Sequence, residues 1–389
     1  MKSRKFVVWG TALGFAAATV VAQDTGLKYR FAPESGDCDL VEAHRGALVH
    51  TRQATATAEG GLGDLFKQLG DLCRAAGADL DDAARLNLYA STDDPALLDA
   101  VRAGVRGRWQ PGVRMPAVTL VVTPLPGGAR VAGDAVVWKK AAPDAGPVVE
   151  HFQGDTATMP PGRDIFHLSG RAAKADTLAE ATRGTVAELL AVLKELGGRP
   201  ADAVRIKAFV QPMSDWQSVH REIEAAFGES GAPPVVLVEW TSSLPTEIEM
   251  IAAAPDRAET EETLTFFTPS GDKASPVFSR VARVHGDTLL YTRGIVGTEA
   301  DTPDAEVKSA FARLDDFARG SGSDLRHLVK ATYYVSDDAV SKAHNEIRPH
   351  VFDPARPPAA SKVAVKTLAD RDRGLLMDFI AVPAPKGGK

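Results

Sequence analysis

The sequence predicts an α+β protein built from three tandem copies of one unit, each with strands and two helices. The first observation is a strand that recurs three times in the 389 residues. Its copies run from Ala84 to Ala90, from Val204 to Val210 and from Val329 to Val335. Arg85, Arg205 and Lys330 take matching places in them, 120 and 125 residues apart. A repeat of this length is a whole domain and not a solenoid turn.

Amphipathic helices on both sides of the recurring strand are the second observation. In the middle unit, Val186, Leu189 and Leu193 recur at helical spacing before the strand, and Val219 and Ile223 do so after it. The first and third units repeat this pattern, and each helix before the strand ends near a glycine.

Short apolar runs outside the helices predict further strands. The clearest case is a hairpin-like pair before the third unit's first helix, Phe278 to Val284 and Thr288 to Thr292, joined by a turn at Gly286. Two segments rich in Pro and acidic residues, Lys139 to Pro161 and Ala254 to Pro276, separate the units. They are typical of linkers or of early edge segments.

The N-terminus has the pattern of a cleavable signal peptide. Basic residues precede an apolar run from Phe6 to Val21, and small residues lead up to Gln23, so cleavage is expected after Ala22. The run is short for a membrane span of about 20 residues, which makes a membrane anchor the weaker alternative. We therefore expect a secreted or periplasmic protein that has no membrane contact after cleavage.

Charge and cysteine content narrow the possible partners. The net charge is −6 and becomes −9 without the signal peptide, so a nucleic-acid partner is not expected. Export would permit a disulfide between Cys38 and Cys73, but Cys73 also continues an apolar helical series, and a buried thiol is the alternative. No zinc-ligand spacing and no phosphate-binding loop occur in the sequence, and we expect neither a metal nor a cofactor.

The residues of the second and third units resemble the RidA family, also called YjgF/YER057c/UK114. The resemblance is carried by the strand Ile165 to Arg171 with its Ser-Gly, by Leu244-Pro245 followed by Glu247 to Ala252, and by Met377 to Val382. The first unit matches most weakly, through Ala84 to Ala90 and Pro116 to Thr119. We place a signal peptide at 1–22 and RidA-like domains at 30–140, 148–254 and 264–384.

The resemblance implies a chorismate mutase-like fold, with two helices on one face of a mixed sheet. Family members form homotrimers with ligand sites in the clefts between subunits. Three units in one chain therefore imply an intramolecular pseudo-trimer, either monomeric or part of a higher homo-oligomer. The family's enzymes hydrolyse enamines and imines to a 2-keto acid and ammonia, with an arginine that holds the substrate carboxylate and a glutamate that handles water and proton.

The family's chemical groups are largely missing from this chain. The arginine is replaced three times, by Val118, Val235 and Ala360. The glutamate survives once, as Glu247, and its counterparts are Leu376 and Ala132. A second carboxylate, two residues further along the strand, remains in all three units; these carboxylates are Glu249, Asp378 and Asp134.

The candidate site residues follow from the same alignment. Glu247 is the candidate catalytic group, and Glu249 points to the same face of its strand. Arg52 or Arg293 could supply a relocated anion clamp, although a surface arginine at a strand end is the plainer interpretation. The remaining candidate ligand contacts are Ser169, Gly170, Arg171, Val235, His220, Gly294 and Asn345.

We expect an exported RidA-like protein that binds a small metabolite of imine, enamine or keto-acid type between its domains. Residual hydrolytic deaminase activity would centre on Glu247. Two alternatives remain open: a non-catalytic scaffold or oligomerisation module, and a specialised hydrolase for a larger, chorismate-like substrate.

Overall fold

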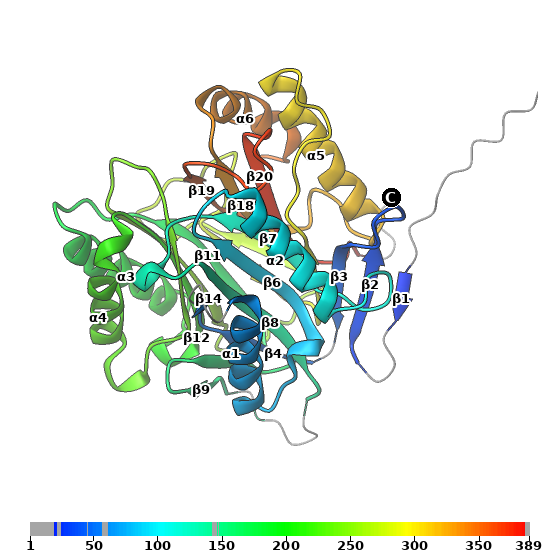
Figure 1. The fold of residues 1–389 in the computed structure, drawn as a ribbon. Helices are drawn as coiled ribbons and strands as arrows, with labels where there is room; N and C mark the ends of the chain where they lie inside the picture. Colours follow the sequence, from blue (N-terminus) through cyan, green and yellow to red (C-terminus); the bar gives the residue numbers. More distant parts are fainter. Residues whose placement is uncertain are drawn as a thin grey trace, which may run out of the picture.

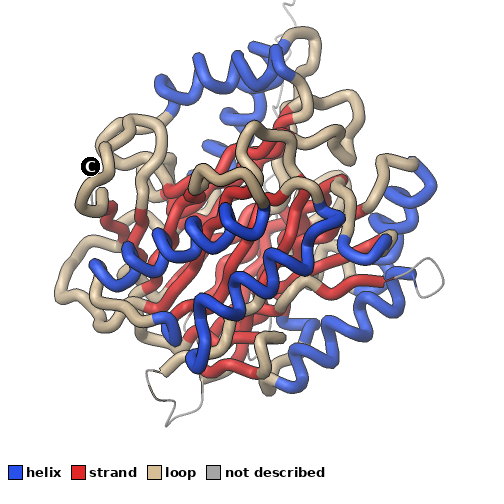
Figure 2. Tube along the Cα trace, turned by 90° about the vertical axis from the view of Figure 1, so that its left-hand side faces the viewer, coloured by secondary structure: helices blue, strands red, loops and turns tan. Residues whose placement is uncertain are grey.

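Three β-sheets meet in the middle of the molecule and helices cover their outer faces (Figures 1 and 2). The computed structural model describes residues 19–21, 25–44, 46–56, 61–141, 146 and 148–385. The predicted signal peptide lies outside the described residues except for Thr19–Val21, which form the edge strand β1. We use first, second and third unit for residues 30–140, 148–254 and 264–384, boundaries that stay a prediction.

The first sheet has the strand order β7-β6-β8-β4-β10-β9, and β5 also pairs with β8. Helix α1 packs against β8, β5 and β4, and α2 packs beside α1. The bounds are β4 (Ala47–Thr51), β5 (Ala54–Ala56), α1 (Gly61–Ala75), η1 (Leu80–Asp82), β6 (Ala83–Ala90), α2 (Pro95–Arg108), β7 (Ala117–Val122), η2 (Pro126–Gly128), β8 (Val131–Lys139), β9 (Glu150–Phe152) and β10 (Thr156–Met159).

The second sheet has the order β13-β12-β14-β11-β16-β15, with α3 against β14 and α4 against α3. The bounds are β11 (Ile165–Arg171), α3 (Leu178–Glu195), η3 (Pro200–Asp202), β12 (Ala203–Val210), η4 (Met213–Asp215), α4 (Trp216–Phe227), η5 (Gly228–Ser230), β13 (Val235–Glu239), β14 (Thr246–Ala253), β15 (Leu264–Phe267) and β16 (Val281–Val284).

The third sheet has the order β1-β2-β3-β17-β20-β18-β19, with α5 against β20 and α6 against β18. The bounds are β1 (Thr19–Val21), β2 (Leu27–Phe31), β3 (Cys38–His44), β17 (Thr288–Thr292), α5 (Pro303–Arg319), β18 (Leu328–Val335), α6 (Asp338–Val351), β19 (Ala359–Ala364) and β20 (Leu375–Ala381).

Four strands take the same order in every sheet, namely β4-β8-β6-β7, β11-β14-β12-β13 and β17-β20-β18-β19. The last two strands of each set are parallel and the other neighbours are antiparallel, so each sheet is mixed. The predicted fold class, three α+β units packed as an intramolecular pseudo-trimer, is confirmed.

The predicted hairpin before α5 is wrong in its pairing. β16 and β17 both form, but β16 pairs with β11 and β15 in the second sheet, whereas β17 pairs with β3 and β20 in the third. In the same way β3 and β4 belong to different sheets. Alternating apolar residues and a turn specify strands without specifying their partners. The exchange covers what would otherwise be an unpaired strand edge in each unit.

Helices α2, α3, α5 and α6 begin where the sequence supplies a capping side chain. Thr177 accepts a hydrogen bond from the Glu180 backbone N–H at the start of α3, and Thr302 accepts one from Ala305 before Pro303 opens α5. Such a cap stabilises a helix by about 1 kcal/mol. The apolar faces predicted for these helices are buried against the sheets, as Val186 and Leu189 illustrate in α3.

Three buried ion pairs connect the units in a closed ring around the centre. Arg85 of the first unit pairs with Asp378 of the third. Arg205 of the second pairs with Asp134 of the first at 2.6 Å, and Lys330 of the third pairs with Glu249 of the second at 2.7 Å. The three recurring basic residues and the three retained carboxylates thus form the ring. A cavity of about 30 Å³ adjoins it, which is room for a water molecule or two.

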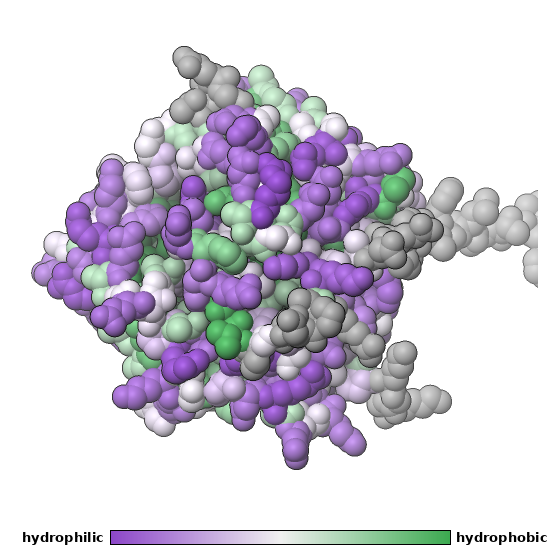
Figure 3. Space-filling view, turned by 90° about the horizontal axis from the view of Figure 1, so that it is seen from below, coloured by the Kyte–Doolittle hydropathy of each residue, from purple (hydrophilic) through white to green (hydrophobic). Residues whose placement is uncertain are grey.

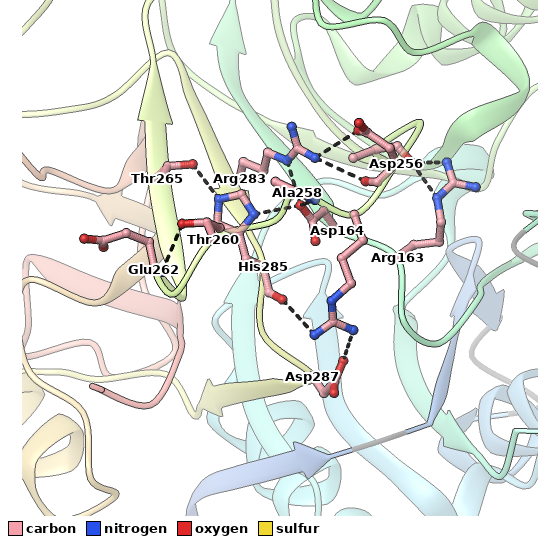
Figure 4. Close-up of polar contacts among 12 residues, drawn as sticks. Arg163, Asp164, Asp256, Ala258, Thr260, Glu262, Thr265, Arg283, His285 and Asp287 are labelled. Atoms are coloured by element: carbon pink, nitrogen blue, oxygen red, sulfur yellow. Dashed lines mark hydrogen bonds and ion pairs between the residues drawn. The ribbon is translucent and has the colours of Figure 1, made fainter. Parts of the chain in front are cut away.

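A second polar cluster fastens the second unit to the chain that follows it (Figure 4). The Asp164 carboxylate, just before β11, accepts hydrogen bonds from Arg283 Nε at 2.8 Å, His285 Nδ1 at 2.7 Å and the Ala258 N–H at 3.0 Å. The Thr265 hydroxyl lies 2.7 Å from His285 Nε2. Because these partners lie on or beside β15 and β16, the cluster holds the exchanged strands on β11.

The cysteines and the connectors between units also bear on the sequence predictions. Cys38 and Cys73 are both free and buried, so the buried-thiol alternative holds. The two predicted connectors contain β9, β10 and β15, which makes them edge segments of the sheets. Hydrophilic residues cover most of the face in Figure 3, with apolar residues in small groups. Within the described ranges, no helix combines the length and apolar character needed to cross a membrane.

Candidate functional site

The cleft between the second and third units, which we call the Glu247 cleft, is a cavity with several charged side chains in its lining. Its volume is about 460 Å³, within the range of about 300–1,000 Å³ that is usual for small-molecule sites. Gly170, Arg171 and Glu247 line it from the second unit, and Ala360 and Lys362 line it from the third. The cleft therefore brings the surviving glutamate to the position of the lost arginine.

Glu247 stands near the start of β14 on the face opposite the buried Ile248. Burial raises the pKa of Glu247 to about 7, and the neighbouring Glu249 adds to the shift, while Ser361 and Lys330 oppose it. Glycine at 170 makes room for this side chain, because a Cβ there would overlap the Glu247 carboxylate. A carboxyl group with a pKa near 7 can both accept and donate a proton at neutral pH.

Lys362 and Arg348 bring positive charge to the same cleft. Lys362 lies two residues beyond Ala360 on β19 and thus on the same face of the strand. Its ammonium donates to Ser341 Oγ at 2.7 Å, to Asn345 Oδ1 at 2.9 Å and to the Ser341 carbonyl at 3.2 Å. Burial, with Arg348 adding, lowers the pKa of Lys362 to about 8, so the side chain is mostly charged at pH 7.

Arg348, on α6, lies over the Tyr333 ring with 5.6 Å between Cζ and the ring centroid. Among the described residues, neither Arg348 nor Lys362 forms a salt bridge with a carboxylate. Burial lowers the pKa of Arg348, against an opposing effect of Tyr333. Two cations held close together without a carboxylate partner are a favourable place for an anion.

The other two arginines of the cleft are already paired. Arg171 contacts Asp272 and lies 3.7 Å from Glu188, and Arg280 lies 3.9 Å from Asp272. Arg171 was predicted as a ligand contact, and it does line the cleft, but its charge is balanced within the protein. The anion-binding capacity of the cleft therefore resides in Lys362 and Arg348.

Three other predicted residues lie beside this cleft and are occupied by protein contacts. The Ser169 hydroxyl donates to the Ser279 carbonyl at 2.6 Å and accepts from the Ala360 N–H at 2.8 Å. Glu249 accepts from Ser361 at 2.7 Å and joins the central ring through Lys330. Burial alone would raise the pKa of Glu249, but Lys330 and Lys207 outweigh it, so the pKa is lowered. Asn345 accepts a hydrogen bond from the Lys362 ammonium.

At the boundary between the first and second units, Gln53 of the first unit packs against the backbone of β13. The Gln53 N–H donates to the Val235 carbonyl at 3.1 Å, and its side-chain amide exchanges hydrogen bonds of 3.0 and 3.3 Å with the backbone of Leu237. Val235, predicted as a ligand contact, is covered by this arrangement. Arg52 turns to Asp155 and the Gln53 carbonyl.

The last predicted residues do not meet Glu247. His220 packs edge-on against Trp216, with ring centroids 5.4 Å apart, and burial lowers its pKa. Arg293 pairs with Asp39 at 2.9 Å, and the Gly294 N–H donates to the Val118 carbonyl at 2.9 Å. Arg293 and Gly294 border a different cavity, between the third and first units.

Sequence reasoning missed Lys362 and Arg348. Lys362 had a usable signal, since a residue two places after the lost arginine on a strand must face the same way. Arg348 had none, because the packing of α6 against β18 decides which part of the helix borders the cleft. Across the described ranges, no group of three or more His, Cys, Asp or Glu side chains is placed to hold a metal ion.

The geometry defines a class of protein: three α+β units in one chain, with ligand-sized cavities at unit boundaries. Residues 273–382 match the family model described as Endoribonuclease L-PSP. This match covers most of the third unit and agrees with the resemblance that the sequence motifs carry. A search of curated proteins found no match.

Solved structures of this family cover about one unit of the chain each. A YjgF family member from Neisseria meningitidis is 20% identical, with 31% of this chain and 95% of that chain covered and a TM-score of 0.24. A YjgF/YER057c/UK114 family member from Mycobacterium tuberculosis is 24% identical over 30% and 98%, with a TM-score of 0.23. The E. coli protein TdcF, solved with bound serine, is 21% identical over 25% and 81%, with a TM-score of 0.23.

Proposed function

We propose that the chain binds a small anionic metabolite, of imine, enamine or keto-acid type, in the Glu247 cleft. One observation carries the proposal: Glu247, with a pKa of about 7, shares its cavity with Lys362 and Arg348, which have no carboxylate partner in the described part of the chain. The cations take over the task of the family's missing arginine. The ligand carboxylate would lie on Lys362 and Arg348 with its reactive carbon towards Glu247.

The same arrangement supports a hydrolytic deamination. Glu247, as a carboxylate, takes a proton from water while the water oxygen bonds to the carbon of the C=N group. The nitrogen takes up a proton, and the carbon–nitrogen bond then breaks to leave a 2-keto acid and ammonia. One water is consumed for each ammonia released, and no redox partner is needed. Glu247 returns to its starting state by handing on its proton.

The experiment compares the wild type with Glu247→Gln. A thermal-shift screen with imine and keto-acid panels identifies a ligand, and ammonia release from a freshly generated imine measures turnover. We expect wild-type binding and turnover, and a loss of turnover in Glu247→Gln with the ligand still bound. Binding without turnover in the wild type would reduce the proposal to a binding protein. Absence of binding across both panels would favour the scaffold alternative.

We also propose that the chain is exported and that cleavage follows Ala22. The proposal rests on the N-terminal pattern of basic, apolar and small residues. N-terminal sequencing of the protein recovered from the periplasm or culture medium tests it. A mature protein that begins at Gln23 is expected, and an intact Met1 terminus on all recovered protein would refute it.

A further inference from the structure

The boundary between the third and first units holds a second cavity of a different chemical character, which we call the Leu376 cleft. Its volume is about 320 Å³. Apolar side chains from four elements line its floor and walls: Leu88, Val101, Val105, Val118, Leu120 and Leu376. Charged residues line other parts of the cavity, namely Asp37, Arg102, Arg106, Arg293 and Asp370.

Strand register shows that this cleft occupies the place of the Glu247 cleft, one unit further round. Leu376 pairs with Tyr334 across β20 and β18, as Glu247 pairs with Phe209 across β14 and β12. Val118 on β7 takes the place that Ala360 takes on β19. The group that would transfer a proton is here replaced by leucine, so the Leu376 cleft can bind a ligand but lacks this group.

The charges at the mouth of the Leu376 cleft are balanced within the protein. Arg106 contacts the Asp37 carboxylate at 3.1 and 2.8 Å, and Arg102 pairs with Asp370 at 3.0 Å. Arg293, the third arginine at this cavity, pairs with Asp39. With each arginine paired, the cleft offers no cation of the kind that Lys362 and Arg348 supply. It therefore favours a neutral ligand.

We propose that the Leu376 cleft is a second ligand site, for a neutral apolar or aromatic molecule of one to three rings. Apolar burial would supply most of the binding free energy, at about 25 cal/mol per Å². Met115, which also borders the cavity, has an unbranched side chain that can adapt to ligands of different shape. The inference does not rest on the function proposed for the Glu247 cleft, because the two cavities share no residue.

The test is a titration with N-phenyl-1-naphthylamine, a neutral probe that fluoresces in apolar surroundings, followed by competition with indole. We expect saturable binding of one probe per chain and displacement by indole but not by 2-oxobutanoate. Leu376→Glu should weaken probe binding about tenfold or more, because a carboxyl group in the floor must lose water when the apolar ligand enters. Glu247→Gln, in the other cleft, should leave probe binding unchanged.

A second variant guards against misfolding. Val118→Phe fills the cavity with hydrocarbon, and it should reduce probe binding even if Leu376→Glu does not fold. Circular dichroism and the thermal midpoint establish which variants are folded. The proposal is overturned if the wild type shows no saturable binding, if 2-oxobutanoate displaces the probe, or if a folded Leu376→Glu or Val118→Phe variant binds the probe as the wild type does.

Discussion

Replacing Glu247 by glutamine should stabilise the protein, and by an amount that depends on pH. Burial raises the pKa of Glu247 from an ordinary 4.5 to about 7. Between these pH values the folded protein holds a proton that the unfolded chain releases, so stability falls as pH rises through this window. At about 1.4 kcal/mol per pKa unit, the loss approaches at most about 3.5 kcal/mol above pH 7. Glutamine stays neutral, so the variant does not lose this stability as the pH rises.

The assay is guanidinium unfolding of wild type and Glu247→Gln at pH 5, 6, 7 and 8. The difference in unfolding free energy should be small at pH 5 and grow in favour of the variant until about pH 7.5. Other titrating groups are common to both proteins and cancel in the difference. Glu259→Gln, at an exposed loop position, serves as the matched control and should show little change with pH. A difference for Glu247→Gln that does not change with pH would show that the carboxylate is well solvated, and would refute the reasoning.

Three further predictions concern the structures around the clefts. Gly170→Ala should displace the Glu247 carboxylate and weaken keto-acid binding while the thermal midpoint changes little; calorimetry measures both, and unchanged affinity would contradict the packing seen at Gly170. Arg205→Met should lower the unfolding free energy by about 3–5 kcal/mol, because it leaves Asp134 buried without its ion pair; the double variant with Asp134→Leu should recover part of the loss in denaturant unfolding, and no recovery would argue against the pairing. Gln53→Ala should lower the unfolding free energy by about 1–3 kcal/mol, because the Leu237 N–H and carbonyl lose their hydrogen bonds to the Gln53 amide. No change in the same assay would mean that water replaces the amide.

The repeat could be predicted from sequence because its signals are local. Amphipathic helices and the recurring strand carry their periodicity within a few turns, and the matching places of Arg85, Arg205 and Lys330 revealed the copies. The pairing of β16 and β17 could not be predicted, since a strand's own residues do not identify the edge on which it docks. Only the assembled units show that each sheet borrows strands from a neighbour.

The part of the site that lies within one unit could be predicted from sequence, again because its signals are local. Glu247 and Gly170 could be placed in one cleft because they lie on neighbouring strands of a single unit. The family's motif also led to Ser169 and Glu249, whose polar atoms instead form hydrogen bonds and an ion pair with the neighbouring unit. Arg348 borders the cleft through the packing of a helix on a sheet, which no short sequence pattern encodes. An aligned motif therefore located the cleft but not the groups that supply its positive charge.

Calorimetric titration of 2-oxobutanoate into wild type, Lys362→Met and Lys366→Met tests the central claim most directly. Lys366 is a matched control, because it lies just beyond the same strand but is 76% exposed and 3.8 Å from Glu239. Loss of a charge-assisted contact costs about 1.5–3 kcal/mol, so Lys362→Met should weaken binding about ten- to a hundredfold. Lys366→Met should bind as the wild type does. Equal affinity of all three proteins, or no binding by the wild type, would contradict an anion site at Lys362.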